Sequence, residues 1–424
     1  MIKILSGANF KAKSKISSPT HADIVATVSK IIADVIDRGD EALRDYTKEF
    51  DGCELESFEV SRNLIDEAAL SIDPEFYEIM ERAAKNIEEF HRLQIREGFE
   101  IRPDDGVILG QRVIPLNRVG LYVPGGTAAY PSSVLMNVIP AKLAGVKEII
   151  IVTPPQKDGT VNPAILAAAK IAGADTVLTI GGAQAVAALA YGTKSVPRVD
   201  KITGPGNAYV AEAKRQVFGV CGIDMIAGPS DILVIADSTA DPVLVAADML
   251  SQCEHGSDSP AVLVTTDEAL GRAVSEQLEI QLNELSRGEM ARAAVLDHGM
   301  IIIAKDLDEA FEIANDMAPE HLEICLDNPM DYLDKVINAG SVFLGKSTPE
   351  ALCDYYAGPN HTLPTEGTAR FSSPLSVDDF VKKSSYAYYS EDALKKAAAD
   401  VITFANKEGL TAHAQSVAKR VNLK

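Results

Sequence analysis

The stretch from residue 148 to residue 192 alternates short apolar runs with longer alanine-rich runs: EIIIVT (148–153), NPAILAAAKIAG (162–173), TVLTI (176–180) and GAQAVAALAYG (182–192). The short runs are rich in β-branched residues, which favour buried strands, and the longer runs have the length and composition of helices. Strands and helices in regular alternation predict a parallel sheet that is covered by helices on both faces.

The same alternation returns beyond residue 230, in ILVIAD (232–237), AVLVTT (261–266), MIIIAK (300–305) and SVFLG (341–345). The first hundred residues and the stretch from residue 391 onward instead show apolar residues at helical spacing. We therefore expect an α/β fold with two Rossmann-like parallel-sheet lobes and with helical N- and C-terminal extensions.

The composition excludes several classes of partner. The chain of 424 residues carries a formal net charge of −21, which repels nucleic acid and anionic lipid. No stretch approaches the roughly 18 apolar residues of a membrane-spanning helix, and the N-terminus lacks the apolar run of a signal peptide. Five scattered cysteines without C-x-x-C spacing indicate reduced thiols. We expect a cytoplasmic protein that binds neither nucleic acid nor membranes.

The segment DPVLVAADMLSQCEH (241–255) predicts a helix that begins at an Asp241 N-cap and runs to His255. Gln252 and His255 would share one face of this helix, whereas Cys253 would point to the other side. An amide oxygen and an imidazole nitrogen together suit a divalent metal. On this helix alone, however, a polar helix end satisfied by its own side chains is the simpler interpretation.

Two further clusters combine carboxylates with imidazoles. Glu320 and His321 stand together in APEHLEI (318–324), where they would divide acid and base work if an irregular entry to the strand aims both at one pocket. Asp354 and His361 lie in a Gly/Pro-rich loop, which suits a metal ligand and a substrate contact. An exposed loop pair explains the first cluster equally well. In the second, Asp and Asn are also common turn-forming residues, and turn formation fully explains Asn360.

The remaining histidines give weaker signals. Glu408 and His413 flank a glycine near the end of the sequence, and a lone histidine on such a helix is more often a surface residue. His21, His91 and His298 have no comparable neighbours, so we interpret all three as surface residues.

Glycine-rich turns recur in VGLYVPGGTAAYPSS (119–133), TIGGAQAVAALAYGT (179–193), ITGPGNAYVAEAKR (202–215) and MIAGPSDILV (225–234). Backbone N–H groups ahead of a helix hold anions such as a nucleotide's phosphates. None of these turns is G-x-G-x-x-G, so the two lobes are incomplete as Rossmann folds. Tight turns of any α/β fold explain the glycines equally well.

Taken together, the motifs resemble the histidinol dehydrogenase family over nearly the whole chain and in the same order. The matching stretches are RVGLYVPGG, GGAQAVAALAYGT, TGPGNAYVAEAKR, GPSD, SQCEHG, APEHLEI, DYYAGPNHTLPT, ARFSSPLSVDDF and EGLTAHAQSV. So many motifs in register are far more specific than any one of them. The resemblance implies an NAD-dependent alcohol and aldehyde dehydrogenase of histidine biosynthesis, which oxidises L-histidinol to L-histidine through L-histidinaldehyde with two NAD.

The resemblance also implies roles for individual residues in a homodimer with one Zn²⁺ per subunit. The zinc ligands would be Gln252, His255, Asp354 and His413. The catalytic acid–base pair would be Glu320 and His321. The substrate would contact Ser230, Gln252, His255, His321, Asp354, His361, Glu408 and His413, with Glu408 and His413 contributed across the dimer interface. NAD would contact Tyr122, Gln184 and Asn207.

The domain boundaries that we expect are an N-terminal arm (1–20), a catalytic domain (21–118 with 231–374), an NAD-binding domain (119–230) and a C-terminal helical dimerisation segment (375–424).

Two motifs depart from the usual family pattern. The chain reads QCEHG where QAEHD is common, and GPSD where GPSE is common. Since Cys253 would face away from the metal, we expect no catalytic thiol. The alternatives are a related dehydrogenase that acts on another amino alcohol, a zinc hydrolase that works without NAD, and a binding module without catalysis.

Overall fold

The computed structural model describes residues 2–10, 22–125 and 129–421. The chain divides into two compact units: a larger one of Met1–Gln94 with Leu116–Phe380, and a smaller one of Ile95–Pro115 with Val381–Lys424. Most of the expected N-terminal arm, at residues 1 and 11–20, lies outside the described residues, as does His21. Every described helix is too short or too polar to cross a membrane.

The first sheet of the larger unit has five parallel strands in the order β6-β5-β4-β7-β8. Its strands are β4 (Arg118–Tyr122), β5 (Glu148–Thr153), β6 (Thr176–Thr179), β7 (Lys201–Thr203) and β8 (Gly222–Ile223). From β4 the chain adds β5 and β6 on one side, then β7 and β8 on the other. The direction in which strands are added therefore reverses between β4 and β7. Open α/β sheets bind ligands at this kind of reversal, just outside the carboxyl ends of the strands.

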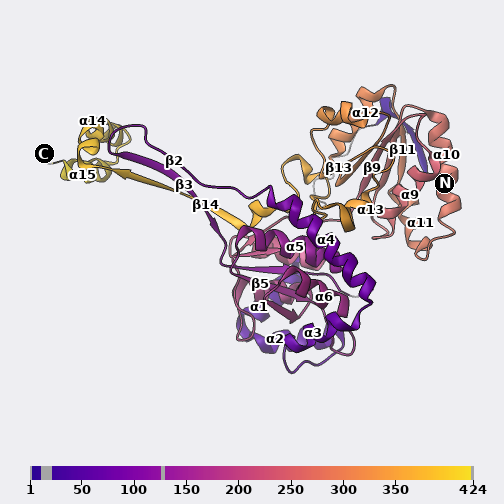
Figure 1. Cartoon of the computed structure of the whole chain (residues 1–424), viewed down its shortest axis with the longest axis horizontal. Helices are drawn as coiled ribbons and strands as arrows, with labels where there is room; N and C mark the ends of the chain where they lie inside the picture. Colours follow the sequence, from indigo (N-terminus) through magenta and orange to yellow (C-terminus); the bar gives the residue numbers. More distant parts are fainter. Residues whose placement is uncertain (1, 11–21, 126–128, 422–424) are drawn as a thin grey trace. The chain divides into compact units, whose positions relative to one another are not determined.

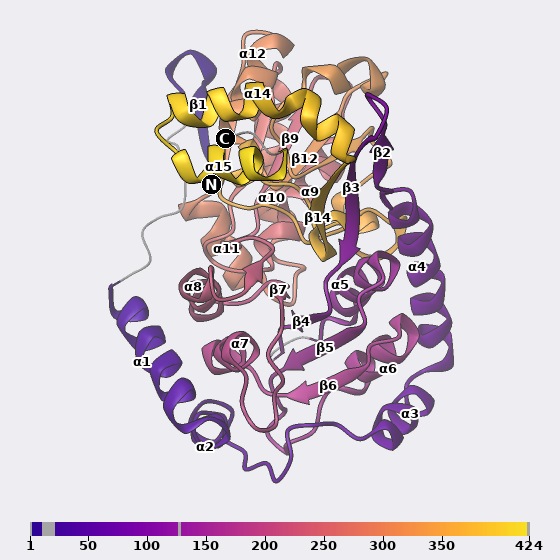
Figure 2. The same ribbon diagram turned by 90° about the vertical axis from the view of Figure 1, so that its left-hand side faces the viewer.

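Helices cover both faces of this sheet, and Figure 2 shows them on opposite sides of β4, β5 and β6. One face carries α1 (Ala22–Arg38), α2 (Asp40–Tyr46), α7 (Gly182–Tyr191) and α8 (Ala208–Val217). The other carries α5 (Pro131–Ala144) and α6 (Pro163–Ala172), with α3 (Arg62–Ser71) and α4 (Pro74–Arg92) packed against them. Most residues of α5 and α7 are buried, which explains why their sequences are apolar on all sides.

The second sheet of the larger unit has six parallel strands in the order β1-β11-β10-β9-β12-β13. Its strands are β1 (Lys3–Ser6), β9 (Ile232–Ala236), β10 (Ala261–Thr265), β11 (Met300–Ile303), β12 (His321–Cys325) and β13 (Ser341–Leu344). Without β1 its order repeats that of the first sheet, with the reversal between β9 and β12. The sequence analysis does not predict β1, because a four-residue edge strand whose side chains are all exposed has no alternation to reveal it.

On one face of the second sheet lie α9 (Pro242–Cys253), α10 (Glu268–Gln281) and α11 (Gly288–Asp297), and on the other lies α12 (Leu307–Met317) (Figure 1). Asp241 caps α9 as expected, accepting the Val243 N–H at 2.8 Å. The helix ends at Cys253, two residues before the expected end at His255. A crossover helix runs back against its strands, so the end of α9 returns to the amino edge of the sheet.

The smaller unit combines an antiparallel sheet with two helices. The sheet has the order β14-β3-β2, and α14 packs against α15 (Figures 1 and 2). Its elements are β2 (Phe99–Ile101), β3 (Val107–Pro115), β14 (Val381–Tyr389), α14 (Glu391–Lys407) and α15 (Thr411–Arg420). Since β3 pairs with β14 along its whole length, residues 95–115 group with the end of the chain. This grouping differs from the expected boundaries, which assigned residues 21–118 to the catalytic domain.

A buried ion pair between Lys214 and Asp224 fixes the TGPGN turn (203–207) at the carboxyl edge of the first sheet. Lys214 Nζ donates a hydrogen bond to the Gly204 carbonyl oxygen (2.9 Å), and Asp224 accepts the Gly204 N–H (2.8 Å). Gly204 has a φ of +107°, and a Cβ atom there would lie 2.1 Å from the carbonyl oxygen of Tyr122. Only glycine fits this position.

We expect Lys214→Met to lower the free energy of unfolding by about 3–5 kcal/mol, because it leaves the Asp224 carboxylate buried without its partner. Urea unfolding followed by circular dichroism measures the change. The control Lys142→Met removes the solvent-exposed Lys142–Asp175 pair, and it should cost at most about 1 kcal/mol. Equal effects of the two substitutions would contradict the structural role of Lys214.

Candidate active site

The amino ends of β9 and β12 bring Asp231, Glu320 and His321 together. The strands pair with His321 opposite Ile232, which sets Asp231 beside Glu320. The Glu320 N–H donates to the Asp231 carboxylate (2.9 Å), and the Asp231 N–H donates to the Glu320 carboxylate (3.1 Å). Glu320 and His321 are 4% and 3% exposed, and Glu320 Oε2 lies 3.7 Å from His321 Nδ1. Ala318, two residues before Glu320, has a φ of +49°, so the entry to β12 (His321–Cys325) is irregular.

The contacts of the His321 ring decide which nitrogen carries its hydrogen. Nδ1 lies 2.9 Å from the Asp231 carbonyl oxygen, which only accepts hydrogen bonds, so Nδ1 is the protonated atom. Nε2 then offers a lone pair, and it has no hydrogen-bond partner among the described residues. Burial lowers the pKa of His321, and the ring stacks on Phe343 with centroids 5.9 Å apart. A neutral, fixed imidazole with a free lone pair is suited to general base catalysis.

The environment of Glu320 favours its protonated form. Burial raises the pKa of Glu320 well above its ordinary value, and the charges of Asp231 and Asp354 add to this effect. The Asp231 N–H and the side chain of Ser230, a half-buried residue, oppose it and lower the pKa. A buried carboxyl group of this kind exchanges protons nearer neutral pH than an exposed one, which suits acid–base work.

Asp354 faces His321 from η4 (Cys353–Ala357), a π-helical turn after the short helix α13 (Glu350–Leu352). Its Oδ1 lies 3.9 Å from His321 Nε2. Ligand atoms of Asp354, Glu350 and His321 all lie within 4.8 Å of one another. Burial and the adjacent Glu350 raise the pKa of Asp354 to about 9, as expected for carboxylates that need a proton or a cation between them. The sequence analysis assigns no role to Glu350, whose only signal is its place just ahead of the polar loop.

Gln252 lies at the end of α9 and is 1% exposed. Neither its amide oxygen nor its amide nitrogen has a hydrogen-bond partner in the part of the chain that the structure describes. A buried amide without partners is costly, typically by about 1–3 kcal/mol, so this side chain is suited to a ligand. His255 lies in the turn beyond the helix, where its side chain is exposed. A positive charge on His255 would add to the burial that lowers the pKa of His321.

Cys253 faces the core, on the side that the helix geometry predicts. The side chain is fully buried and its thiol donates to the Met249 carbonyl oxygen (3.3 Å). Burial raises the pKa of Cys253 to about 12, so it carries no thiolate at neutral pH. Arg287 holds the next residue in place by donating to the Glu254 carbonyl oxygen (3.1 Å).

His361 connects the polar loop with the first sheet. Its Nδ1 contacts the Asp354 carbonyl oxygen (3.0 Å) and its Nε2 contacts Ser133 Oγ on α5 (3.2 Å). Burial lowers the pKa of His361 to about 4, so the ring is neutral at physiological pH. The loop therefore spans from the candidate acid–base pair to α5.

The interpretation of His91 as a surface residue is wrong. His91 is fully buried on α4, where its Nδ1 contacts the Ile87 carbonyl oxygen (2.9 Å) and its Nε2 contacts the Asn360 amide (3.3 Å). His91 lies in none of the polar clusters of the sequence, but it shares the buried face of α4 with Ile87, one turn earlier. His298 is half-buried.

Glu408 and His413 belong to the smaller unit. Glu408 is the C-cap of α14, and His413 lies in the first turn of α15. Gly409, with a φ of +76°, lies at the break between the two helices. Both side chains are exposed and therefore accessible to a ligand or to another chain.

The three residues assigned to NAD lie near the carboxyl edge of the first sheet. Tyr122 ends β4, and its hydroxyl accepts the N–H of Gly182 at the start of α7 (3.0 Å). Gln184 is 1% exposed, and its amide oxygen has no partner among the described residues. Asn207 is exposed and caps α8, accepting two N–H groups of its first turn (3.0 and 3.1 Å). Its amide NH₂ is the part left for a ligand.

Two polar residues that the sequence analysis missed lie in the same half of the larger unit, and each has a buried side-chain oxygen without a hydrogen-bond partner in the part of the chain that the structure describes. Thr153 at the end of β5 is fully buried, and its hydroxyl has no partner among the described residues. Asp51 ends the π-helical turn η2 (Thr47–Asp51), and burial raises its pKa to about 6. The charge of Asp51 adds to the burial that raises the pKa of Tyr122 to about 12. Neither residue stands in a recognisable motif, so only the fold reveals them.

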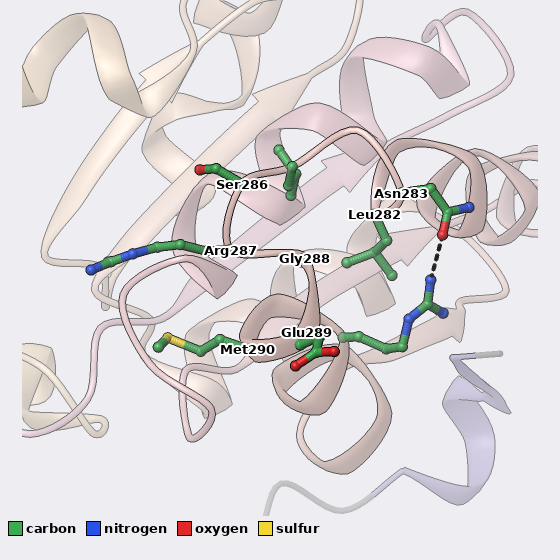
Figure 3. A pocket seen from close by; sticks show the side chains of 9 residues that line it. Leu282, Asn283, Ser286, Arg287, Gly288, Glu289 and Met290 are labelled. Carbon is green, nitrogen blue, oxygen red and sulfur yellow. Dashed lines mark hydrogen bonds between the residues drawn. The ribbon is translucent and has the colours of Figure 1, made fainter.

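A pocket of about 620 Å³ lies at the corner between α10 and α11. Figure 3 shows Asn283 and Arg287 at opposite ends of it, with Leu282 and Met290 among the side chains that line it. It contains none of the residues assigned to catalysis, metal or cofactor. Its relation to the site is indirect, through the Arg287 contact with the turn that carries His255.

A second group of possible ligands lies deeper between α9 and β12. Atoms of Asp248, Glu323 and Cys325 approach one another within 4.8 Å. Burial and the adjacent Asp248 raise the pKa of Glu323 to about 9, and burial also raises the pKa of Cys325. A carboxyl pair that shares one proton accounts for this group without a metal.

The comparisons with known proteins agree with one another. The sequence profile of the family described as histidinol dehydrogenase matches residues 15–421. The histidinol dehydrogenase of Streptococcus mutans is 53% identical over 425 residues, which cover 99% of each chain. That of Bacillus cereus is 54% identical over 391 residues, covering 92% of this chain and 91% of the relative. The crystal structure of histidinol dehydrogenase from Elizabethkingia anophelis gives a TM-score of 0.93 at 38% identity, covering 99% of this chain and 98% of that one.

Together with two Rossmann-type sheets and the buried Glu320–His321 pair, these matches define the protein as an oxidoreductase. The chain belongs to the histidinol dehydrogenase family. Its activity is the final step of histidine biosynthesis.

Glu320→Gln is expected to stabilise the chelator-treated protein at pH 8 relative to the unsubstituted chain, and to do so less at pH 5. Burial raises the pKa of Glu320 in the folded state. The contribution of the protonated Glu320 side chain to the free energy of unfolding is therefore complete below the ordinary pKa of 4.5, and it is lost as the pH rises through the folded-state pKa. Glutamine has no such loss. Urea midpoints at several pH values, with Glu268→Gln on exposed α10 as control, measure the difference. A difference that does not vary with pH would contradict a buried, hard-to-ionise Glu320.

Proposed function

We propose that this chain oxidises L-histidinol to L-histidine through L-histidinaldehyde, using two NAD and one zinc ion per subunit. The observation that carries the proposal is the buried pair of Glu320 and His321, in which His321 Nε2 has a free lone pair 3.9 Å from Asp354. Such a pair can take a proton from an alcohol and later from water. The family to which the chain belongs gives the substrate.

Gln252, His255 and Asp354 would hold the zinc ion, with His413 of the partner subunit as the fourth ligand. The donor set fits, because Gln252 has a buried amide with no partner among the described residues and Asp354 shares a compact group of ligand atoms with His321 and Glu350. Amide, imidazole and carboxylate groups suit a borderline divalent cation. When bound, zinc would orient the imidazole and amine of the substrate and polarise its hydroxyl group.

In the first oxidation, His321 is the general base. Its Nδ1–H is fixed by the Asp231 carbonyl oxygen, so Nε2 takes the hydroxyl proton while hydride leaves the carbinol carbon. NAD supplies the acceptor for that hydride. Ser230, His361 and the partner subunit's Glu408 would contact the polar groups of the substrate and hold the carbinol carbon in place.

In the second oxidation, Glu320 takes a proton from water as the water oxygen bonds to the aldehyde carbon. His321, having released its first proton, takes a hydroxyl proton from the resulting hydrate as the second hydride leaves. The overall balance is one alcohol, one water and two NAD⁺ converted to one carboxylate, two NADH and three protons. Burial supports this division, because it raises the pKa of Glu320 toward neutral pH and lowers the pKa of His321, which keeps the imidazole unprotonated and able to accept a proton.

The carboxyl edge of the first sheet is the proposed NAD site, through Tyr122, Gln184 and Asn207. Support comes from the reversal of strand order between β4 and β7 and from the amide oxygen of Gln184, which has no hydrogen-bond partner among the described residues. Cofactor binding here would use backbone N–H groups of the fixed TGPGN turn, although the G-x-G-x-x-G sequence is missing.

The proposed homodimer would bring Glu408 and His413 of one subunit to the site of the other. Both residues are exposed in the smaller unit. The same unit exposes several large apolar side chains, which a second copy would cover: Phe99, Ile101, Tyr388, Phe404 and Leu410. A self-complementary contact of this kind closes a dimer with two identical sites.

The first test is the amount of NADH formed for each L-histidinol consumed. We expect two NADH for each substrate, with activity lost after chelator treatment and restored by zinc. One NADH, or no turnover of histidinol, would favour a related enzyme for another amino alcohol. Zinc-dependent hydrolysis without NAD would favour the hydrolase.

The shared site predicts complementation between inactive variants. Mixed dimers of Gln252→Ala and His413→Asn contain one intact site, so random reassociation should recover about a quarter of the original activity. In the control, Gln252→Ala is mixed with His255→Asn; both changes fall on the same side of the interface, so neither site is intact and no activity should return. Recovery in neither mixture would place the whole site within one subunit.

A further inference from the structure

Glu350 is a buried carboxylate to which the proposed chemistry assigns no role. It begins α13 directly after Pro349, and its side chain is 3% exposed. A buried carboxylate needs hydrogen-bond donors or a cation nearby, because burial without compensation is costly. Its surroundings therefore indicate what it does.

Both the backbone and the side chain of Glu350 are held in place. Its N–H donates to Glu323 Oε1 on β12 (2.8 Å), and its Oε2 accepts a hydrogen bond from Ser251 Oγ on α9 (2.7 Å). Ser251 directly precedes Gln252. Glu350 is thus attached to the strand that begins with His321 and to the helix turn that carries Gln252.

The Glu350 carboxylate adjoins three of the groups already described. One of its oxygens lies within 4.8 Å of ligand atoms of Asp354 and His321. The Gln252 amide lies beside it as well. Neither the oxygen nor the nitrogen of the Gln252 amide lies at hydrogen-bond distance and angle from another described residue. No hydrogen bond in that part of the chain therefore fixes which way the amide faces.

A carboxylate only accepts hydrogen bonds, so it attracts the NH₂ end of a neighbouring amide and repels its oxygen. With its NH₂ turned toward Glu350, Gln252 presents its oxygen on the opposite side. The oxygen is the only amide atom that ligates a divalent cation. We propose that Glu350 is a positioning residue of the metal site, which orients the Gln252 amide oxygen and the Asp354 carboxylate toward the cation.

This inference rests on the proposed metal site and adds a residue to it. Groups that orient metal ligands typically change metal affinity by about 10–100-fold when they are replaced. Glu350→Gln keeps the volume of the side chain but removes its charge and offers an NH₂ group that competes for the Gln252 oxygen. We therefore expect a loss of zinc affinity in that range.

The experiment measures zinc affinity directly, without turnover. The chelator-treated full-length protein is titrated with zinc in competition with a chromophoric chelator, and zinc content after dialysis is measured in parallel. Glu350→Gln should bind zinc about 10–100-fold more weakly, and Glu350→Asp should recover part of the loss because it keeps the negative charge. Glu268→Gln is the matched control, since it removes the same charge from an exposed pair on α10, and it should leave the affinity unchanged.

A second variant keeps the test decisive if Glu350→Gln does not fold. Ser251→Ala removes the hydroxyl that holds Glu350 Oε2 and should weaken zinc binding to a smaller degree. Unchanged affinity in both variants would overturn the role of Glu350. Gln252→Ala separates this outcome from a failure of the proposed site: if it loses zinc while Glu350→Gln does not, only the positioning role is wrong. If Gln252→Ala also retains full affinity, the metal site itself is wrong.

Discussion

The pairing of β9 with β12 is the constraint on which the candidate active site depends. The pairing places Asp231 beside Glu320 and His321. Asp231 makes two hydrogen bonds with Glu320 and two with His321, and these four bonds hold both residues in place. The Asp231 carbonyl oxygen fixes the hydrogen of His321 on Nδ1 and leaves Nε2 free. A shift in this register would turn His321 to the other face of the sheet, since neighbouring strand residues alternate in direction.

The two sheets share a strand order but use opposite edges. In the first, the glycine turns and the residues assigned to NAD lie at the carboxyl ends of the strands, as is usual for open α/β sheets. In the second, Asp231, Glu320 and His321 lie at the amino ends, where α9 also finishes. The polar loop with His361 spans from this edge to α5 of the first sheet. The proposed cofactor site and the candidate acid–base pair thus belong to the same unit.

The site concentrates ionisable groups in a buried place, which is unfavourable for the protein alone. Burial raises the pKa of Glu320 and of Asp354 and lowers the pKa of His321 and of His361. Each of these pKa shifts favours the uncharged form of its group: the protonated carboxyl of Glu320 and Asp354 and the unprotonated imidazole of His321 and His361. A divalent cation beside Asp354 and Glu350 would reverse this preference for the carboxylates and stabilise their ionised forms.

The sequence by itself determined the features that rest on short-range physics. Strand and helix alternation gave both parallel sheets, the Asp241 cap gave the start of α9, and helix geometry put Cys253 in the core. Family motifs supplied the candidate site residues. Tertiary structure alone decided the contact of Glu350 with Ser251, the contact of the buried His91 with Asn360 and the pairing of β3 with β14. Those features join residues about a hundred or more positions apart, and no local pattern encodes a contact whose partner is chosen only when the sheets and helices pack.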